Sequence, residues 1–281
     1  MKRLWALLLT LALLAGCAPN PVEDGKTHIL CTTYPIYLFT TAVTEGVEGV
    51  EVELLVDQQT SCLHNYTLTV RDMKAIEGAD IIIMNGAGLE EFMDDALARS
   101  DAQVIDCSEN IDLLPSLDHH HHDNEDEDEH EVDPHYWMDP RRAGQMIWNI
   151  AHGLGLDIPT SLPRLFSEGQ GPLFPLITFH DGFQYFADAY GLELLKSIEE
   201  EEGAEASARE LMEIIQLVEE YDIPAIFVER NGSRRSADVI ARETGCKVVE
   251  LDMIMSGDGQ GIEPYLQAME HNLNAVKEAL S

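Results

Sequence analysis

The chain has 281 residues, a hydrophobic fraction of 45% and a formal net charge of −35. This length suffices for two modest domains or one large domain, each with a real core. The acidic excess argues against a nucleic-acid partner, because phosphate binding needs clustered Lys and Arg, and it is compatible with the attraction of cations.

The N-terminus has the pattern of an export signal. A basic segment, Met1 to Arg3, precedes an apolar stretch from Leu4 to Ala15 that is too short to span a membrane as a helix. The stretch leads into Leu-Leu-Ala-Gly-Cys, which resembles a bacterial lipobox. Residues 1–16 are therefore predicted to be a lipoprotein signal peptide, Cys17 the lipidated residue and residues 17–26 a tether. An unmodified secretory signal with a chance cysteine is the alternative.

Strands and helices alternate in the first half of the chain. The run Asp80 to Met84 (DIIIM) is apolar throughout, which is typical of a strand buried on both faces. Strands that alternate with helices predict a parallel sheet with crossover connections. The predicted strands are 27–34, 50–56, 80–84 and 103–106, and the predicted helices are 35–43, 71–78 and 89–99.

The second half repeats this plan after a helix at 140–154. Its predicted strands are 176–179, 225–229 and 247–252, and its predicted helices are 182–190, 207–221, 236–244 and 263–279. The segment 157–175 is rich in proline and glycine and is interpreted as the connection between two lobes. The predicted fold class is α/β, with two Rossmann-like α/β lobes that carry parallel sheets. The lobes are residues 27–140 and 176–281, joined by 141–175.

An acidic, histidine-rich loop at 118–133 lies late in the first lobe. It contains four consecutive histidines and a fifth further on: His119, His120, His121, His122 and His130. An Asp/Glu run alone is typical of a solvated loop. A short His-rich tract favours metal binding instead, since neutral imidazole is the commonest metal-binding side chain. The loop is predicted to collect metal ions, and a sensor of metal sufficiency or a plain spacer are the alternatives.

Three further histidines follow, or lie near, predicted strand ends or loops. They are His64 in SCLHNY, His135 in DPHYW and His180 in TFHDGF. In open α/β sheets ligands bind outside the carboxyl ends of the strands. Taken singly, such a histidine is more often a structural or surface residue. Together with Asp252, at the end of the last strand, the three imidazoles suit a four- or five-coordinate Zn²⁺ site.

The cysteines of the predicted mature domain give no thiolate site. Cys31, Cys62, Cys107 and Cys246 are widely spaced, and no Cys-x-x-Cys pair occurs. An even number outside the cytoplasm permits disulfides, but the spacing does not indicate which cysteines would pair.

Five stretches of the chain together resemble one family. They are CTTYPIYLFTTAV, HNYTLTVRDMKAIEGADIIIMNGAGLEEFMDDAL, DPHYWMDP, FHDGFQYFADAYGL and IFVERNGSRRSADVIARETGCKVVELD, and they cover most of residues 27–252. In this order they resemble the metal-binding lipoproteins of ABC-type zinc and manganese uptake systems, the ZnuA/TroA-like solute-binding family. The resemblance implies two α/β lobes joined by a backbone helix, a metal site in the cleft between them and limited hinge motion.

The same resemblance implies a ligand set. His64, His135 and His180 match ligand positions and Asp252 is the fourth candidate, with a water or another carboxylate as the alternative. A histidine at position 180 resembles the zinc-type members, whereas manganese-type members carry glutamate there, and imidazole favours Zn²⁺ over Mn²⁺. Only 44 residues separate His135 from His180. This is fewer than is usual in the family, so the interlobe helix is expected to be shortened.

The expected function is capture without catalysis. The protein would bind Zn²⁺ outside the cytoplasm, anchored to the membrane through Cys17, and deliver it as a monomer to an ABC permease and its ATPase, with no nucleic-acid partner. A receptor for manganese or another divalent metal, and a zinc-buffering or adhesin lipoprotein, are the alternatives. A zinc hydrolase with Glu229 as base is a further alternative, against which no His-Glu-x-x-His motif occurs.

Overall fold

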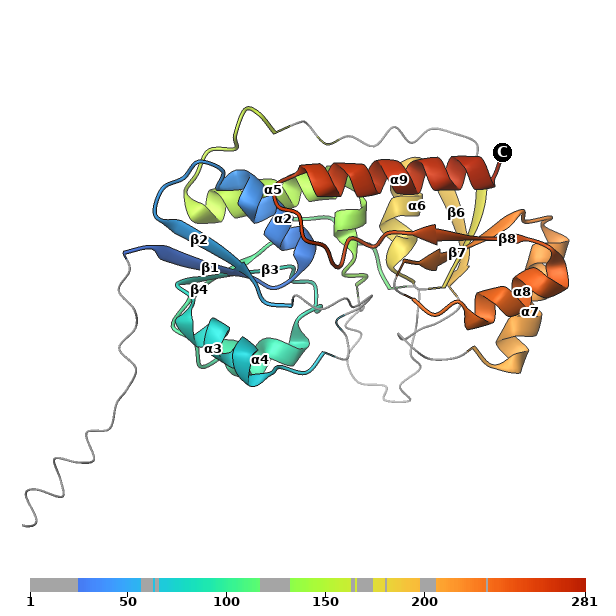
Figure 1. The fold of residues 1–281 in the computed structure, drawn as a ribbon, viewed down its shortest axis with the longest axis horizontal. Coiled ribbons are helices and arrows are strands. Elements are labelled where there is room, and N and C mark those ends of the chain that lie inside the picture. Colours follow the sequence, from blue (N-terminus) through green and yellow to red (C-terminus); the bar gives the residue numbers. More distant parts are fainter. Residues whose placement is uncertain are drawn as a thin grey trace, which may run out of the picture.

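Two α/β lobes, each built on a parallel four-stranded sheet, make up the computed structural model (Figure 1). The structure describes residues 25–56, 63, 66–116, 132–162, 165, 174–179, 181–197, 206–230 and 232–281. Several expectations fall outside these residues and stay predictions. They concern the signal peptide and Cys17, Cys62, His64, the loop histidines His119 to His122 and His130, and His180.

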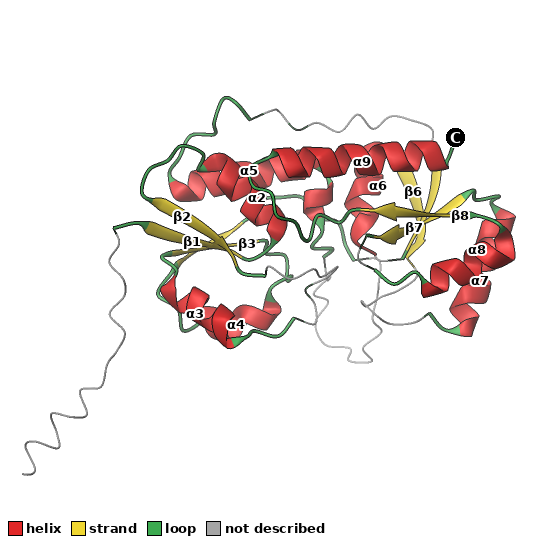
Figure 2. Ribbon diagram, in the orientation of Figure 1, coloured by secondary structure: helices red, strands yellow, loops and turns green. Residues whose placement is uncertain are grey.

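The first sheet has the strand order β2-β1-β3-β4. Helices α2 and α5 lie on one of its faces, and α3 and α4 lie on the other (Figure 2). The strands are β1 (Thr27–Cys31), β2 (Val50–Leu54), β3 (Ile81–Met84) and β4 (Gln103–Asp106). The helices are α2 (Tyr34–Val43), α3 (Val70–Gly78), α4 (Asp94–Leu97) and α5 (Pro140–Leu154), with 3-10 turns η1 (Glu91–Met93) and η2 (Tyr136–Met138).

The second sheet has the equivalent order, β6-β5-β7-β8. Its strands are β5 (Phe174–Thr178), β6 (Leu192–Ser197), β7 (Ala225–Glu229) and β8 (Lys247–Leu251). Its helices are α6 (Gln184–Tyr190), α7 (Ala208–Glu220), α8 (Arg235–Thr244) and α9 (Glu263–Ala279), with a 3-10 turn η3 (Asp181–Phe183). In both sheets the second strand lies on one side of the first and the third strand on the other. The carboxyl end of each first strand is therefore a topological switch point, where ligands bind in such sheets.

The C-terminal helix α9 lies along both lobes (Figure 1). It packs on β8 of the second sheet, and Tyr265 meets Phe39 of α2 edge to face, with ring centroids 5.1 Å apart. Helix α5 instead packs on α2 and β4 and ends at Gly155, which takes the left-handed conformation (φ 67°). One continuous cluster of buried residues reaches from the first sheet into the second. Among the described residues, no helix has both the length and the apolar character needed to cross a bilayer.

The parallel α/β organisation expected from the sequence is confirmed, and two elements differ. Strand β6 was not predicted, because its sequence LELLKS consists largely of good helix formers. Pairing with β5, directly after the left-handed Gly191 that ends α6, overrides that preference. The predicted helix 89–99 is reduced to η1 and the four-residue α4, because Glu90 belongs to the preceding turn and its carboxylate accepts hydrogen bonds from backbone amides there.

Gly86 gives a test of that turn. It has a φ of +78°, and a Cβ there would overlap the Asp106 carboxylate. We expect Gly86→Ala to lower the free energy of unfolding by about 2 kcal/mol or more, from left-handed strain and overlap combined. Gly46 has a φ of +77° but no atom within 4 Å of a built Cβ, so Gly46→Ala should cost only about 1 kcal/mol. If urea denaturation gave both variants the same loss of unfolding free energy, the overlap of the added Cβ with Asp106 would be contradicted.

Candidate metal centre

His135 is the predicted ligand that the structure describes most fully. It is 1% exposed and immediately precedes η2. One Asp133 carboxylate oxygen accepts from the His135 backbone N–H (2.9 Å) and lies 2.8 Å from Nδ1. With the Nδ1 proton donated to this carboxylate, the neutral ring carries its lone pair on Nε2. A carboxylate behind a metal-binding histidine has this role in many sites, because it fixes the tautomer and the ring orientation.

Asp133 is itself held by residues of both lobes. Its backbone N–H donates to the Leu114 carbonyl (3.0 Å). The Tyr185 hydroxyl, from α6 of the second lobe, donates to the Asp133 carbonyl (2.8 Å) and accepts from the Leu114 N–H (2.8 Å). Burial raises the pKa of Tyr185 well above its usual range, so the hydroxyl stays protonated and can donate. The carboxylate behind His135 therefore has a fixed position.

Gly182 of the second lobe lies next to the His135 ring. A Cβ at Gly182 would lie 3.1 Å from Cδ2 of His135 and would overlap the methyl group of Met253. The indole N–H of Trp137 donates to the Met253 carbonyl (3.0 Å). Gly182 is two residues after His180, and Met253 is one residue after Asp252. Three of the sequence motifs thus meet at this point, and only glycine fits between them.

The Asp252 carboxylate is engaged elsewhere. One oxygen accepts from Nη1 of Arg230 (2.5 Å) and the other accepts from the Ile254 N–H (2.8 Å). The Asp252 backbone is fixed on both sides by Asn272 of α9, through two hydrogen bonds of 2.7 Å. Both carboxylate oxygens of Asp252 thus have hydrogen-bond partners, and its role as a ligand stays a prediction.

Within the described part of the chain, no three His, Cys, Asp or Glu side chains gather as a metal site would require. His64 and His180 lie outside that part. The described residues closest to His64 in the sequence are Leu63 and Tyr66. Leu63 is fully buried in the core, and the Tyr66 hydroxyl donates to Asp72 (2.9 Å). The set of three histidines and the fourth ligand therefore remain predictions around one well-defined histidine, His135.

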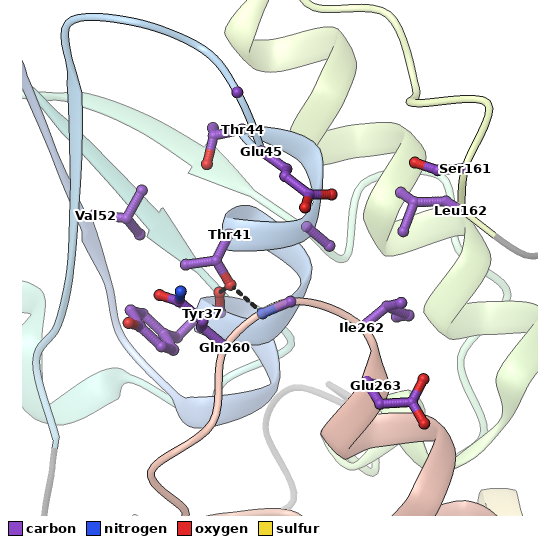
Figure 3. Close-up of a pocket in the computed structure, with 13 residues that line it drawn as sticks. Tyr37, Thr41, Thr44, Glu45, Val52, Ser161, Leu162, Gln260, Ile262 and Glu263 are labelled. Carbon is purple, nitrogen blue, oxygen red and sulfur yellow. Dashed lines mark hydrogen bonds between the residues drawn. The ribbon is translucent and has the colours of Figure 1, made fainter.

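The cavities do not point to another metal site. Asp252, Arg230 and His271 line one of about 390 Å³. A larger one, of about 570 Å³, lies between α2 and the start of α9, where the Gly261 N–H donates to the Thr41 hydroxyl (Figure 3). Among the described residues that line it, the carboxylates are those of Glu45 and Glu263.

Three cysteines lie among the described residues, and all three are buried. Cys31, Cys107 and Cys246 are free thiols in the described residues. Burial raises the pKa of Cys31 to about 12 and that of Cys107 well above its usual range, so both thiols stay protonated.

Sequence reasoning missed Asp133 and Arg230 as partners of the predicted ligands. Asp133 had a readable signal, since a carboxylate two residues before a histidine can reach back to its ring nitrogen. Arg230 had no such signal, because its pairing with Asp252 depends on the neighbouring ends of β7 and β8.

We expect Asp133→Ala to weaken zinc binding about 10-fold or more, because the His135 ring would lose the carboxylate that sets its tautomer and orientation. Calorimetric titration of the metal-stripped protein measures this. The control is Asp101→Ala, which removes a carboxylate of the same type at an exposed position and should leave the affinity unchanged. Equal affinity in Asp133→Ala and the wild type would show that zinc binding does not depend on the Asp133–His135 hydrogen bond.

Arg230→Ala should strengthen zinc binding if Asp252 is a ligand, because the metal then has no guanidinium to displace. Arg230 is 54% exposed, so the released ion pair is worth no more than about 1 kcal/mol, or about fivefold in affinity. Arg234→Ala, which removes the adjacent pair with Glu250 (2.6 Å), is the matched control. An affinity that both variants leave unchanged would contradict competition between Arg230 and the metal for the Asp252 carboxylate.

Comparison with known proteins places this chain in a family. The family model described as "Zinc-uptake complex component A periplasmic" (ZnuA) matches residues 29–157 and 172–279. The zinc-binding lipoprotein AdcA of Streptococcus pneumoniae is 29% identical, over 99% of this chain and 61% of AdcA. The chain thus spans less than two thirds of that relative. The high-affinity zinc uptake system protein ZnuA of Bacillus subtilis is 28% identical, over 100% of this chain and 99% of that protein.

A solved structure supports the same assignment. The Zn(II)-bound ZnuA-like domain of Streptococcus pneumoniae AdcA superimposes with a TM-score of 0.71 and 27% identity, covering 91% of this chain and 99% of that domain. The family model accounts for most of the chain, including both sheets and the segment around His135. The chain belongs to the ZnuA family.

Proposed function

We propose that this protein is a zinc receptor that captures Zn²⁺ outside the cytoplasm and delivers it to an ABC-type permease and its ATPase. One observation carries the proposal. His135 is buried, its Nδ1 is committed to Asp133, and the chain segments that follow His180 and Asp252 lie against it. This leaves Nε2 as the metal-binding nitrogen of a site between the two lobes.

Zinc is favoured over manganese by the donor set. Three imidazoles, from His64, His135 and His180, suit Zn²⁺ better than Mn²⁺, which prefers oxygen ligands. Two relatives are named for zinc binding or zinc uptake, and the matched solved domain is Zn(II)-bound. Asp252 is the proposed fourth ligand, once Arg230 gives up its carboxylate.

The histidine-rich loop is proposed as an accessory collector. Its histidines (His119 to His122 and His130) and neighbouring carboxylates would bind Zn²⁺ weakly and raise its concentration near the cleft. Zn²⁺ that is weakly bound at several positions of the loop would then transfer to the single tight site.

The location of the protein and its partners belong to the same proposal. Cys17 would carry the lipid anchor, with residues 1–16 removed, and the monomeric mature protein would stay at the outer face of the membrane beside its permease. We divide it into lobes at 27–140 and 176–281, joined by 141–175. The work is binding and release, without catalysis, and no named relative is an enzyme.

Calorimetric titration of the metal-stripped mature protein with Zn²⁺ and Mn²⁺ tests this function. We expect one tight zinc site that weakens at least 100-fold in His64→Ala, His135→Ala and His180→Ala, because each removes one of few ligands. His152→Ala, on an exposed position of α5, is the control. Zinc affinity should also fall as the pH drops below about 6.5, where imidazoles become protonated.

A version that lacks 118–131 separates the tight site from the loop. The tight site should survive this deletion, with only weak additional binding lost. If all zinc binding disappears with the loop while the three histidine variants bind as the wild type does, the cleft site does not exist.

A further inference from the structure

A buried carboxylate outside the predicted ligand set lies at the switch point of the first sheet. Glu90 is 1% exposed. One of its oxygens accepts from the Thr32 hydroxyl (2.6 Å), just after β1, and from the Asn85 N–H (2.7 Å), just after β3. The other oxygen accepts from the Gly86 N–H (3.0 Å). Glu90 therefore ties together the ends of two neighbouring strands.

The turn that Glu90 closes has an unusual backbone. Gly86, Ala87 and Gly88 all have positive φ angles, of 78°, 54° and 81°. Ala87 is not a glycine, so its left-handed conformation is unfavourable by itself and must be stabilised by its surroundings. The carboxylate does this by accepting two successive amide hydrogen bonds at the start of the turn.

Asn85 connects this turn to the metal ligand. Its side-chain amide donates to the Pro134 carbonyl (3.0 Å), and its backbone carbonyl accepts a hydrogen bond from the Tyr136 hydroxyl. Pro134 and Tyr136 are the two residues that flank His135. The position of the His135 backbone thus depends on Asn85 as well as on Asp133, and the position of Asn85 depends on Glu90.

We propose that Glu90 is a positioning residue of the zinc site, which holds His135 in place through Asn85 and couples zinc affinity to its own ionisation. The inference rests on the proposed zinc-binding function. A protonated carboxyl presents an O–H where one of the three donors needs an acceptor. Zinc binding, which requires the ordered turn, should therefore favour the ionised form.

The surroundings of Glu90 bring its pKa into the neutral pH range. Burial raises the pKa of Glu90 to about 7, and its three hydrogen bonds oppose that rise. The titratable groups that face it are Asp106 at the end of β4, the Cys107 thiol and the Tyr136 hydroxyl. Asp106 raises the pKa of Glu90 further, while Cys107 and Tyr136 stay protonated because their pKa values lie well above the usual ranges.

Glu90→Gln tests the proposal, because glutamine keeps the size but offers a single acceptor oxygen and no charge. We expect zinc affinity at pH 7.5 to fall about 10-fold. At pH 7, calorimetry in buffers of different ionisation enthalpy should show that the wild type releases up to about half a proton more per zinc than Glu90→Gln, since Glu90 is half protonated there. Glu91→Gln, one residue along and exposed, should match the wild type in both respects.

A second variant approaches the network from its other end. Tyr136→Phe removes the hydrogen bond to the Asn85 carbonyl without touching Glu90. It should weaken zinc binding severalfold and keep the wild-type proton release. It also covers the case in which Glu90→Gln fails to fold, which circular dichroism would reveal.

The outcomes separate this inference from the function on which it rests. Wild-type affinity and proton release in Glu90→Gln would overturn it, as would wild-type affinity in Tyr136→Phe if Glu90→Gln does not fold. If His135→Ala loses zinc while these variants do not, the zinc receptor stands and only the role of Glu90 is wrong. If His135→Ala itself binds zinc normally, the receptor function fails first.

Discussion

The rest of the structure depends on how the buried Trp137 joins the two lobes. Its indole N–H donates to the Met253 carbonyl (3.0 Å), beyond the end of β8, and its carbonyl accepts from the Tyr265 hydroxyl of α9 (2.8 Å). Two residues before it, His135 meets Gly182 of the second lobe. A fully buried tryptophan whose indole N–H and backbone carbonyl are both hydrogen-bonded is held in one position. The segment that carries the candidate ligand is therefore fixed from both sides.

This junction limits how the lobes can move. The same buried cluster contains residues of both sheets and of α9, so a wide opening would expose apolar surface and break the Trp137 hydrogen bonds together. Close to the junction, Arg142 of α5 stacks over the Tyr185 ring (4.7 Å) and pairs with Asp188 (3.1 Å), both on α6. These contacts therefore disfavour a wide separation of the two lobes.

The sequence predicts what depends on local pattern and misses what depends on packing. The DIIIM run identifies β3 because a strand buried on both faces needs uninterrupted apolar residues. His135 could be singled out from its motif, and the structure shows it buried with a carboxylate beside its ring, while its role as a ligand stays a prediction. Strand β6 and the Arg230–Asp252 pair could not be read in this way, since both are decided by which strands lie side by side. The same holds for Glu90, whose partners come from the ends of β1 and β3.

Glu90 also illustrates a cost of building a precise site. Its folded-state pKa of about 7 lies above the value of about 4.3 expected in the unfolded chain. The stability that this raised pKa contributes is therefore fully present below about pH 4 and is lost as the pH rises through about 7. At and above neutral pH the buried charge disfavours the fold, and an apolar residue of similar volume would relieve that penalty. Such a residue would leave two buried backbone amides and a hydroxyl without an acceptor, at the turn that holds Asn85 against the residues flanking His135. The carboxylate is consistent with a site in which the placement of one histidine matters more than the last increment of stability.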